Sequence, residues 1–163
     1  MDPRSDESLT HFDSEGRAKM VDVGDKPDTK RVATATGRVE MAQATLARIL
    51  DRSLEKGDVI QVARLAGIMA AKQTSQLIPL CHPLALSKVE LDIVADGEAS
   101  LKLTAQVSLT GKTGVEMEAL TAVSVAALTI YDMCKSIDRA MRVTDIQLDH
   151  KSGGKSGEFR RTS

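Results

Sequence analysis

Strict alternation of apolar and polar side chains gives the clearest strand of this chain, over residues 100–110. Leucine, alanine and valine occupy the odd positions from 101 to 109, and lysine, threonine, glutamine and serine occupy the even ones. A period of two predicts a strand with one buried face and one solvated face. Residues 87–94 predict a second strand, and Asp96 with Gly97 between the two favours a hairpin.

Two further strands and three helices follow from the remaining pattern. Residues 31–39 predict a first strand and residues 143–148 a last one, whereas the apolar patch at 20–23 fits a loop or a brief strand. Residues 43–53 predict a helix from their apolar spacing. A second helix starts at Asp58, with Gln61 completing a capping box, and ends before Pro79.

The second helix offers two kinds of apolar position. We expect its buried stripe at Val62, Leu65, Ala66, Met69 and Ala70. Alanine at 63 and 71 and glycine at 67 keep the helix thin, so another element can approach it closely. Thr113 with Glu116 predicts a further capping box, which opens a third, long apolar helix.

The predicted order is strand, helix, helix, strand, strand, helix, strand. This order is typical of an α+β, ferredoxin-like fold, with a four-stranded antiparallel sheet and helices packed on one face. We expect a flexible N-terminal segment at 1–19, a single ferredoxin-like domain at 20–151 and a flexible glycine-rich tail at 152–163. The chain's 163 residues favour one domain.

Composition narrows the classes of partner. Only 2% of residues are aromatic and the net charge is −1, which argues against single-stranded nucleic-acid binding and against a membrane surface. Two cysteines make no disulfide framework, the first twenty residues are polar, and the uncharged run at 119–131 is too short for a membrane span. We therefore expect a soluble, cytoplasmic protein.

Ionisable groups stand at both ends of the long apolar helix. Asp132 and Lys135, three residues apart, share a helix face near its end. They form either a surface ion pair of little energetic weight or, if Asp132 is only partly solvated, a pair that keeps one proton available for acid–base work. At the start of the helix, Glu116 and Glu118 either interact favourably with the positive end of the helix dipole or accept hydrogen bonds from a ligand.

A second candidate place is the proline-bracketed turn at 78–83, which carries Cys81 and His82. His82 is either a buried, hydrogen-bonded histidine or a site residue in a rigid loop. Zinc binding with Cys134 is disfavoured, because adjacent residues are awkward joint ligands and no Cys-x-x-Cys pair exists. Four cations are either solvated charges or a pocket for a polyphosphate: Arg31, Lys56, Lys72 and Lys151.

Two Gly-Lys-Ser/Thr triplets, at 111–113 and 154–156, look like the end of a phosphate-binding P-loop. In that motif, another glycine lies five positions before the glycine of the triplet. This chain has Gln106 at that position for the first triplet and Asp149 for the second. The sequence therefore argues against a P-loop nucleotide triphosphatase. Lys112, on a solvated face, is expected to be an ordinary solvated lysine.

Several long motifs in order resemble the MoaC family, the cyclic pyranopterin monophosphate synthases of molybdenum cofactor biosynthesis. They are KGD at 56–58, ARLAG at 63–67, LIPLCHP at 77–83, the stretch 109–127, IYDMCK at 130–135, MVDV at 20–23 and KSGGK at 151–155. The resemblance runs from about residue 9 to residue 160. Gln73 departs from it, because relatives often carry arginine there, and this casts doubt on that position as a phosphate contact.

The resemblance implies conversion of a cyclised dihydro-GTP into cyclic pyranopterin monophosphate, with loss of pyrophosphate and without a redox cofactor. It implies a ferredoxin-like fold and a homohexamer, built as a trimer of dimers with sites at dimer interfaces. Asp132, Lys135 and Lys56 would be catalytic. The remaining matched positions would bind substrate: Leu80, Cys81, His82, Glu116, Met117, Glu118, Arg31, Lys72 and Lys151.

Two other classes of function remain open from the residues alone. A non-catalytic nucleotide sensor would bind a polyphosphate through the same cations and release it unchanged. A structural subunit would use its alanine-rich helices as contact surfaces, and no ligand would change its melting temperature.

Overall fold

The computed structural model describes residue 11 and residues 13–55 and 57–162. Lys56 and residues 1–10 therefore lie outside the described residues. In chain order the elements are β1 (Thr29–Glu40), α1 (Gln43–Leu50), α2 (Val59–Lys72), α3 (Thr74–Leu77), β2 (Lys88–Ala95), β3 (Ser100–Gly111), α4 (Glu116–Cys134), β4 (Arg142–Ser152) and β5 (Phe159–Arg160).

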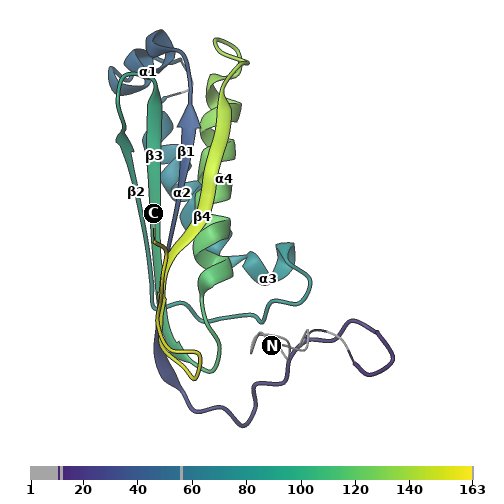
Figure 1. Cartoon of the computed structure of the whole chain (residues 1–163). Helices are drawn as coiled ribbons and strands as arrows, with labels where there is room; N and C mark the ends of the chain where they lie inside the picture. The colour runs from purple at the N-terminus through teal and green to yellow at the C-terminus, as the bar shows by residue number, and fades with distance from the viewer. Residues whose placement is uncertain (1–10, 12, 56, 163) are drawn as a thin grey trace, which may run out of the picture.

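The strands form one antiparallel sheet in the order β2-β3-β1-β4-β5 (Figure 1). The first four strands have the ferredoxin-like order, so the predicted α+β fold is confirmed. β5 adds a short edge strand, which pairs with β4 at His150 and Lys151. The strands thus continue past residue 151, the predicted end of the domain. The predicted flexibility of the tail at 152–163 stays a prediction. Residues 20–23 form a loop.

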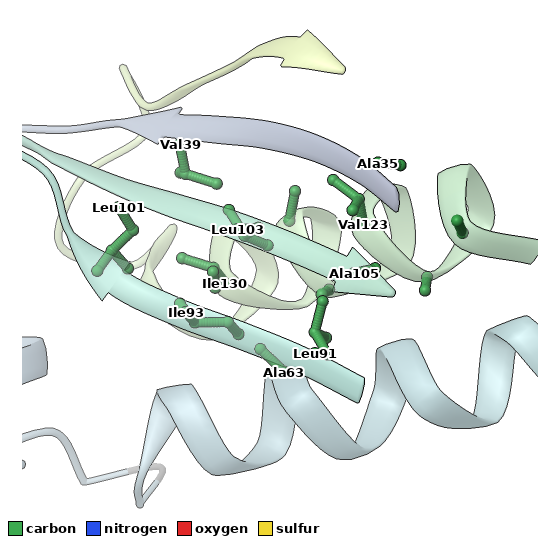
Figure 2. Close-up of a cluster of buried hydrophobic side chains, with 14 of the residues drawn as sticks. Ala35, Val39, Ala63, Leu91, Ile93, Leu101, Leu103, Ala105, Val123 and Ile130 are labelled. Carbon is green, nitrogen blue, oxygen red and sulfur yellow. The ribbon is translucent and has the colours of Figure 1, made fainter. Parts of the chain in front are cut away.

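Small side chains let α2, α4 and the sheet approach one another closely. The odd positions of β3 from 101 to 109 are buried as predicted, and they pack beneath α4. A Cβ atom at Gly67 would lie 2.8 Å from the carbonyl oxygen of Ala122, so α2 passes α4 almost backbone to backbone. Figure 2 shows Ala63 of α2 facing Leu91 and Ile93 of β2.

The buried stripe predicted for α2 is confirmed at Ala70 and wrong at its large residues. Its buried positions are Val59, Ala63, Gly67, Ala70 and Ala71, whereas Val62, Leu65 and Met69 are exposed. Both sets have helical spacing, and the close approach to α4 is possible only for the small one. Larger residues therefore face outward and leave an apolar surface on α2.

Helix starts agree with the sequence in one case and differ in another. Asp58 caps α2, and its carboxylate accepts a hydrogen bond from the Gln61 amide at 3.1 Å. The predicted capping box at Thr113 and Glu116 is wrong, because α4 begins at Glu116, with Val115 in the cap position and no side-chain cap. The carboxylate of Glu116 instead folds back over Gly114.

A residue far along the chain caps α1. Ala42 occupies the cap position and offers no side-chain acceptor. The Asp138 carboxylate accepts hydrogen bonds from the Ala42 amide at 2.8 Å and from the Thr45 hydroxyl at 3.1 Å, which hold the pKa of Asp138 below its ordinary value. This contact ties the segment after α4 to the start of α1.

Among the described residues, α4 is the one helix long and apolar enough to cross a membrane by composition. Most of its residues are buried against β1, β3 and α2, so it is the core helix of this fold.

Candidate active site

Two adjoining cavities lie at the end of the sheet where β3 leads into α4. The larger has a volume of about 780 Å³ and the smaller about 370 Å³. Four residues line both of them, namely Lys26, Thr113, Gly114 and Glu116. Because they share a wall, the cavities form one hollow with two compartments.

Eight of the predicted binding residues line this hollow, although they come from four separate parts of the chain. Leu80, Cys81 and His82 reach the smaller cavity from the turn after α3, and Met117 and Glu118 reach it from the first turn of α4. Arg31 of β1 and Lys151 of β4 line the larger cavity, and Glu116 lines both. The sheet register brings the last two cations together, because Lys151 pairs with Ala33, two residues from Arg31.

Arg31 is held rigidly at the wall of the larger cavity. Its residue is only 8% exposed, and its guanidinium donates to the carbonyl oxygens of Gly111 and Lys112, each at 3.2 Å. A Cβ atom at Gly154 would lie 1.5 Å from one of its terminal nitrogens. Gly154 also has a φ of +75°, so the position needs glycine for both reasons.

The other cations of the larger cavity come from β4 and from three loops. Lys151 donates to the Ser156 hydroxyl and lies 3.9 Å from the Glu116 carboxylate. Lys112, expected to be an ordinary solvated lysine, lines the cavity and donates to the Gly24 carbonyl. The signal that sequence reasoning passed over is its place in the turn that opens α4. Lys26 and Lys155 line the same cavity.

His82 anchors the N-terminal loop at the smaller cavity. Its Nε2 atom lies 2.8 Å from the carbonyl oxygen of Val21. A carbonyl oxygen only accepts, so Nε2 is the donor, and in the neutral ring Nδ1 is then free to accept a proton. His82 is thus hydrogen-bonded and also lines a cavity, which combines the two interpretations left open by the sequence.

Glu118 is a buried carboxyl group beside this histidine-bearing turn. The residue is 3% exposed, and burial raises its pKa to about 7, with a smaller contribution from the charge of Glu116. Burial also raises the pKa of the Cys81 thiol, helped by the charge of Glu118. A carboxyl group that titrates near neutral pH can both donate and accept a proton, as acid–base catalysis requires.

Asp132 and Lys135 form a pair that lies away from this hollow within one chain. The Lys135 Nζ atom is 2.6 Å from the Asp132 carboxylate, and their side chains are 52% and 65% exposed, so the expected partial burial of Asp132 is wrong here. Sixteen residues of helix separate Glu116 from Asp132, which is about 24 Å. Figure 1 places the two ends of α4 at opposite ends of the molecule.

Two further predicted residues lie outside the hollow or outside the described residues. Lys72 ends α2 and lines neither cavity. Lys56 is not among the described residues, so its predicted role stays a prediction. Among the residues that the structure does describe, no group of three histidine, cysteine or acidic side chains is placed to hold a metal ion.

Comparison with known proteins shows the family to which this chain is similar. The sequence profile of the MoaC family matches residues 20–154. A protein of Desulfitobacterium hafniense named cyclic pyranopterin monophosphate synthase is 61% identical over 151 residues, which cover 93% of each chain. Proteins of the same name from Rhodospirillum rubrum and Heliobacterium modesticaldum are 60% and 59% identical, and the matches cover at least 95% of every chain involved.

Proposed function

This chain belongs to the MoaC family, and we propose that it converts 3′,8-cyclo-7,8-dihydro-GTP into cyclic pyranopterin monophosphate with release of pyrophosphate. Its activity is that of a cyclic pyranopterin monophosphate synthase, a lyase of molybdenum cofactor biosynthesis. The observation that carries the choice of substrate is the two-part hollow. A cavity lined by cations adjoins one lined by groups that exchange protons.

The larger cavity suits the triphosphate of this substrate. Arg31 and Lys151 would neutralise negative charge on the phosphates, and the fixed guanidinium of Arg31 offers its donors in a planar fork. Lys72 would add a charge from outside this cavity. The smaller cavity would then hold the purine and ribose portion, against Leu80, Cys81 and Met117.

Ring opening and re-closure need groups that move protons. His82 and Glu118 supply such groups within the hollow. In our proposal Asp132 and Lys135 shuttle protons at the base and ribose, and Lys56 assists a later step, the attack that expels pyrophosphate. Asp132 and Lys135 lie too far from His82 within one chain, so these roles require the pair of a second copy.

We therefore propose a shared site in a homohexamer built as a trimer of dimers. The apolar surface of α2, formed by Val62, Leu65 and Met69, supports an assembly, because these side chains are 44%, 59% and 52% exposed in the single chain. We propose the cytoplasm as its location, with no nucleic acid or membrane as partner and no cofactor in the reaction.

The decisive test is a mass measurement after the purified protein is incubated with 3′,8-cyclo-7,8-dihydro-GTP. We expect a pterin monophosphate and pyrophosphate in equal amounts. The variants Lys135→Ala and Lys56→Ala should abolish product while far-UV circular dichroism and melting temperature stay unchanged. Recovery of unaltered substrate from the wild-type protein would show a binding protein instead of an enzyme, and near-normal turnover in either variant would refute that residue's role.

A further inference from the structure

Lys26 occupies the junction between the two cavities. It is the only lysine or arginine among the described residues that lines both of them. The other shared positions are a threonine, a glycine and a glutamate, so within the described part of the chain Lys26 alone gives this common wall a permanent positive charge.

The ammonium group of Lys26 is available to a ligand, unlike most cations around it. Arg31 donates to two carbonyl oxygens, Lys112 donates to the Gly24 carbonyl, and Lys151 donates to Ser156. Across residues 13–55 and 57–162, no hydrogen bond or ion pair engages the Lys26 ammonium. Lys155 is similarly unengaged, but it lines the larger cavity alone.

The backbone that carries Lys26 is held in place although its side chain is exposed. Its amide donates to the Val23 carbonyl at 3.1 Å, which closes a turn. The preceding loop is attached at two points, by His82 to the Val21 carbonyl and by Lys112 to the Gly24 carbonyl. The anchored turn therefore holds the Lys26 ammonium at the junction of the two cavities, where none of the described residues uses its donors.

We infer that Lys26 is a further catalytic residue, which stabilises the departing pyrophosphate; this inference rests on the proposed function. With the ring system in the smaller cavity and the terminal phosphates in the larger one, the α-phosphate lies at the junction. A substrate hydroxyl attacks the α-phosphorus, and the bond from that phosphorus to the bridging oxygen of the β-phosphate breaks. Pyrophosphate leaves with the electron pair, and the hydroxyl proton passes to a base such as His82 Nδ1.

The ammonium of Lys26 would meet the charge that builds up on the bridging oxygen. This interaction is stronger in the transition state than in the bound substrate, because the oxygen gains charge only as the bond breaks. Loss of one such preorganised donor typically lowers kcat by about 100-fold to 1,000-fold. A cation that merely attracts the triphosphate would instead change KM.

The test follows pyrophosphate release in single-turnover reactions of the full chain with 3′,8-cyclo-7,8-dihydro-GTP. We compare Lys26→Gln with Lys155→Gln, which removes a charge from the larger cavity only, and with Lys30→Gln, an exposed position on β1 that lines neither cavity. Lys26→Arg tests rescue by a retained charge. Melting temperature verifies that each variant is folded.

We expect Lys26→Gln to slow pyrophosphate release by about 100-fold, with half-saturation within threefold of wild type, while Lys26→Arg keeps much of the rate. Lys155→Gln should raise the half-saturation concentration alone, and Lys30→Gln should match wild type. A Lys26→Gln rate within threefold of Lys30→Gln, or an effect on half-saturation only, would overturn the inference. If the wild-type protein forms no product, the proposed function itself has failed.

Discussion

The Nε2 atom of His82 lies 2.8 Å from the carbonyl oxygen of Val21, sixty-one residues earlier in the chain. This hydrogen bond fastens the loop before β1 to the turn after α3, and both segments line the smaller cavity. Because the donor is a candidate site residue, the same side chain both shapes the cavity and presents a proton acceptor, Nδ1, for chemistry.

Loss of this hydrogen bond should release the loop before β1. We expect His82→Ala to speed amide hydrogen exchange over residues 20–26 by about fivefold, the equivalent of about 1 kcal/mol for one hydrogen bond. Exchange in β3 should not change, because the core is untouched. The control is His150→Ala, which removes a contact with Glu158 across the glycine-rich turn at 152–157. Equal protection of residues 20–26 in wild type and His82→Ala would contradict this anchoring role.

The buried carboxyl of Glu118 should make stability depend on pH. Its folded pKa of about 7 exceeds the ordinary value of 4.5, because burial disfavours the charged form. The folded state therefore binds this proton more tightly, and its contribution is full below pH 4.5 and is lost as pH rises through 7. Above pH 7, ionisation of this buried carboxyl should lower the free energy of unfolding by about 3 kcal/mol.

Glu118→Gln removes this titration and should flatten the curve. Its free energy of unfolding relative to wild type should rise between pH 4.5 and pH 8, measured by urea titration with far-UV circular dichroism. Glu98→Gln, at an exposed position, serves as the charge control. Parallel curves for wild type and Glu118→Gln would mean that Glu118 is not held in a buried, protonated state.

Gly67 should resist replacement even by alanine. In an open helix this change stabilises by about 1 kcal/mol. Here the new methyl group would lie 2.5 Å from Leu91 and 2.8 Å from the Ala122 carbonyl oxygen, so α2 must move away from α4. We expect Gly67→Ala to lower the free energy of unfolding by about 1–3 kcal/mol. A variant more stable than wild type would contradict the close helix packing.

The separation of the two ends of α4 predicts complementation between chains. His82→Ala and Lys135→Ala should each be inactive alone. When they are co-expressed with different tags, half of randomly formed dimers are mixed, and each mixed dimer has one of its two sites intact. Activity should therefore return to roughly one quarter of wild type.

A pair of variants from the same half of the site is the control for complementation. His82→Ala with Lys151→Ala should give no recovery, because both residues line the same hollow. If His82→Ala with Lys135→Ala also stays inactive in mixed assemblies, the proposal that two copies share a site is wrong.

Local pattern was enough to predict the four longer strands of the sheet, β1 to β4. The alternation in β3 is a direct consequence of one face being buried, so Leu101 and Leu103 could be assigned to the core without coordinates. Asp58 could be recognised as a cap because its partner, Gln61, is three residues away. In the same way, proline-bracketed His82 and the acidic first turn of α4 were identified as candidate site residues from their immediate neighbours.

Contacts between distant residues were decided by the tertiary structure alone. α2 buries Gly67 and exposes Leu65, although both sides have helical spacing, because only glycine allows the approach to Ala122. The cap of α1 comes from Asp138, ninety-six residues from Ala42, where no spacing rule applies. Lys112 was expected to be an ordinary surface lysine, and only the fold shows that it lines the same cavity as Arg31. Side-chain periodicity identifies the buried face of β3, where only one face is apolar. In α2 both faces are apolar, so the buried one depends on how the whole chain packs.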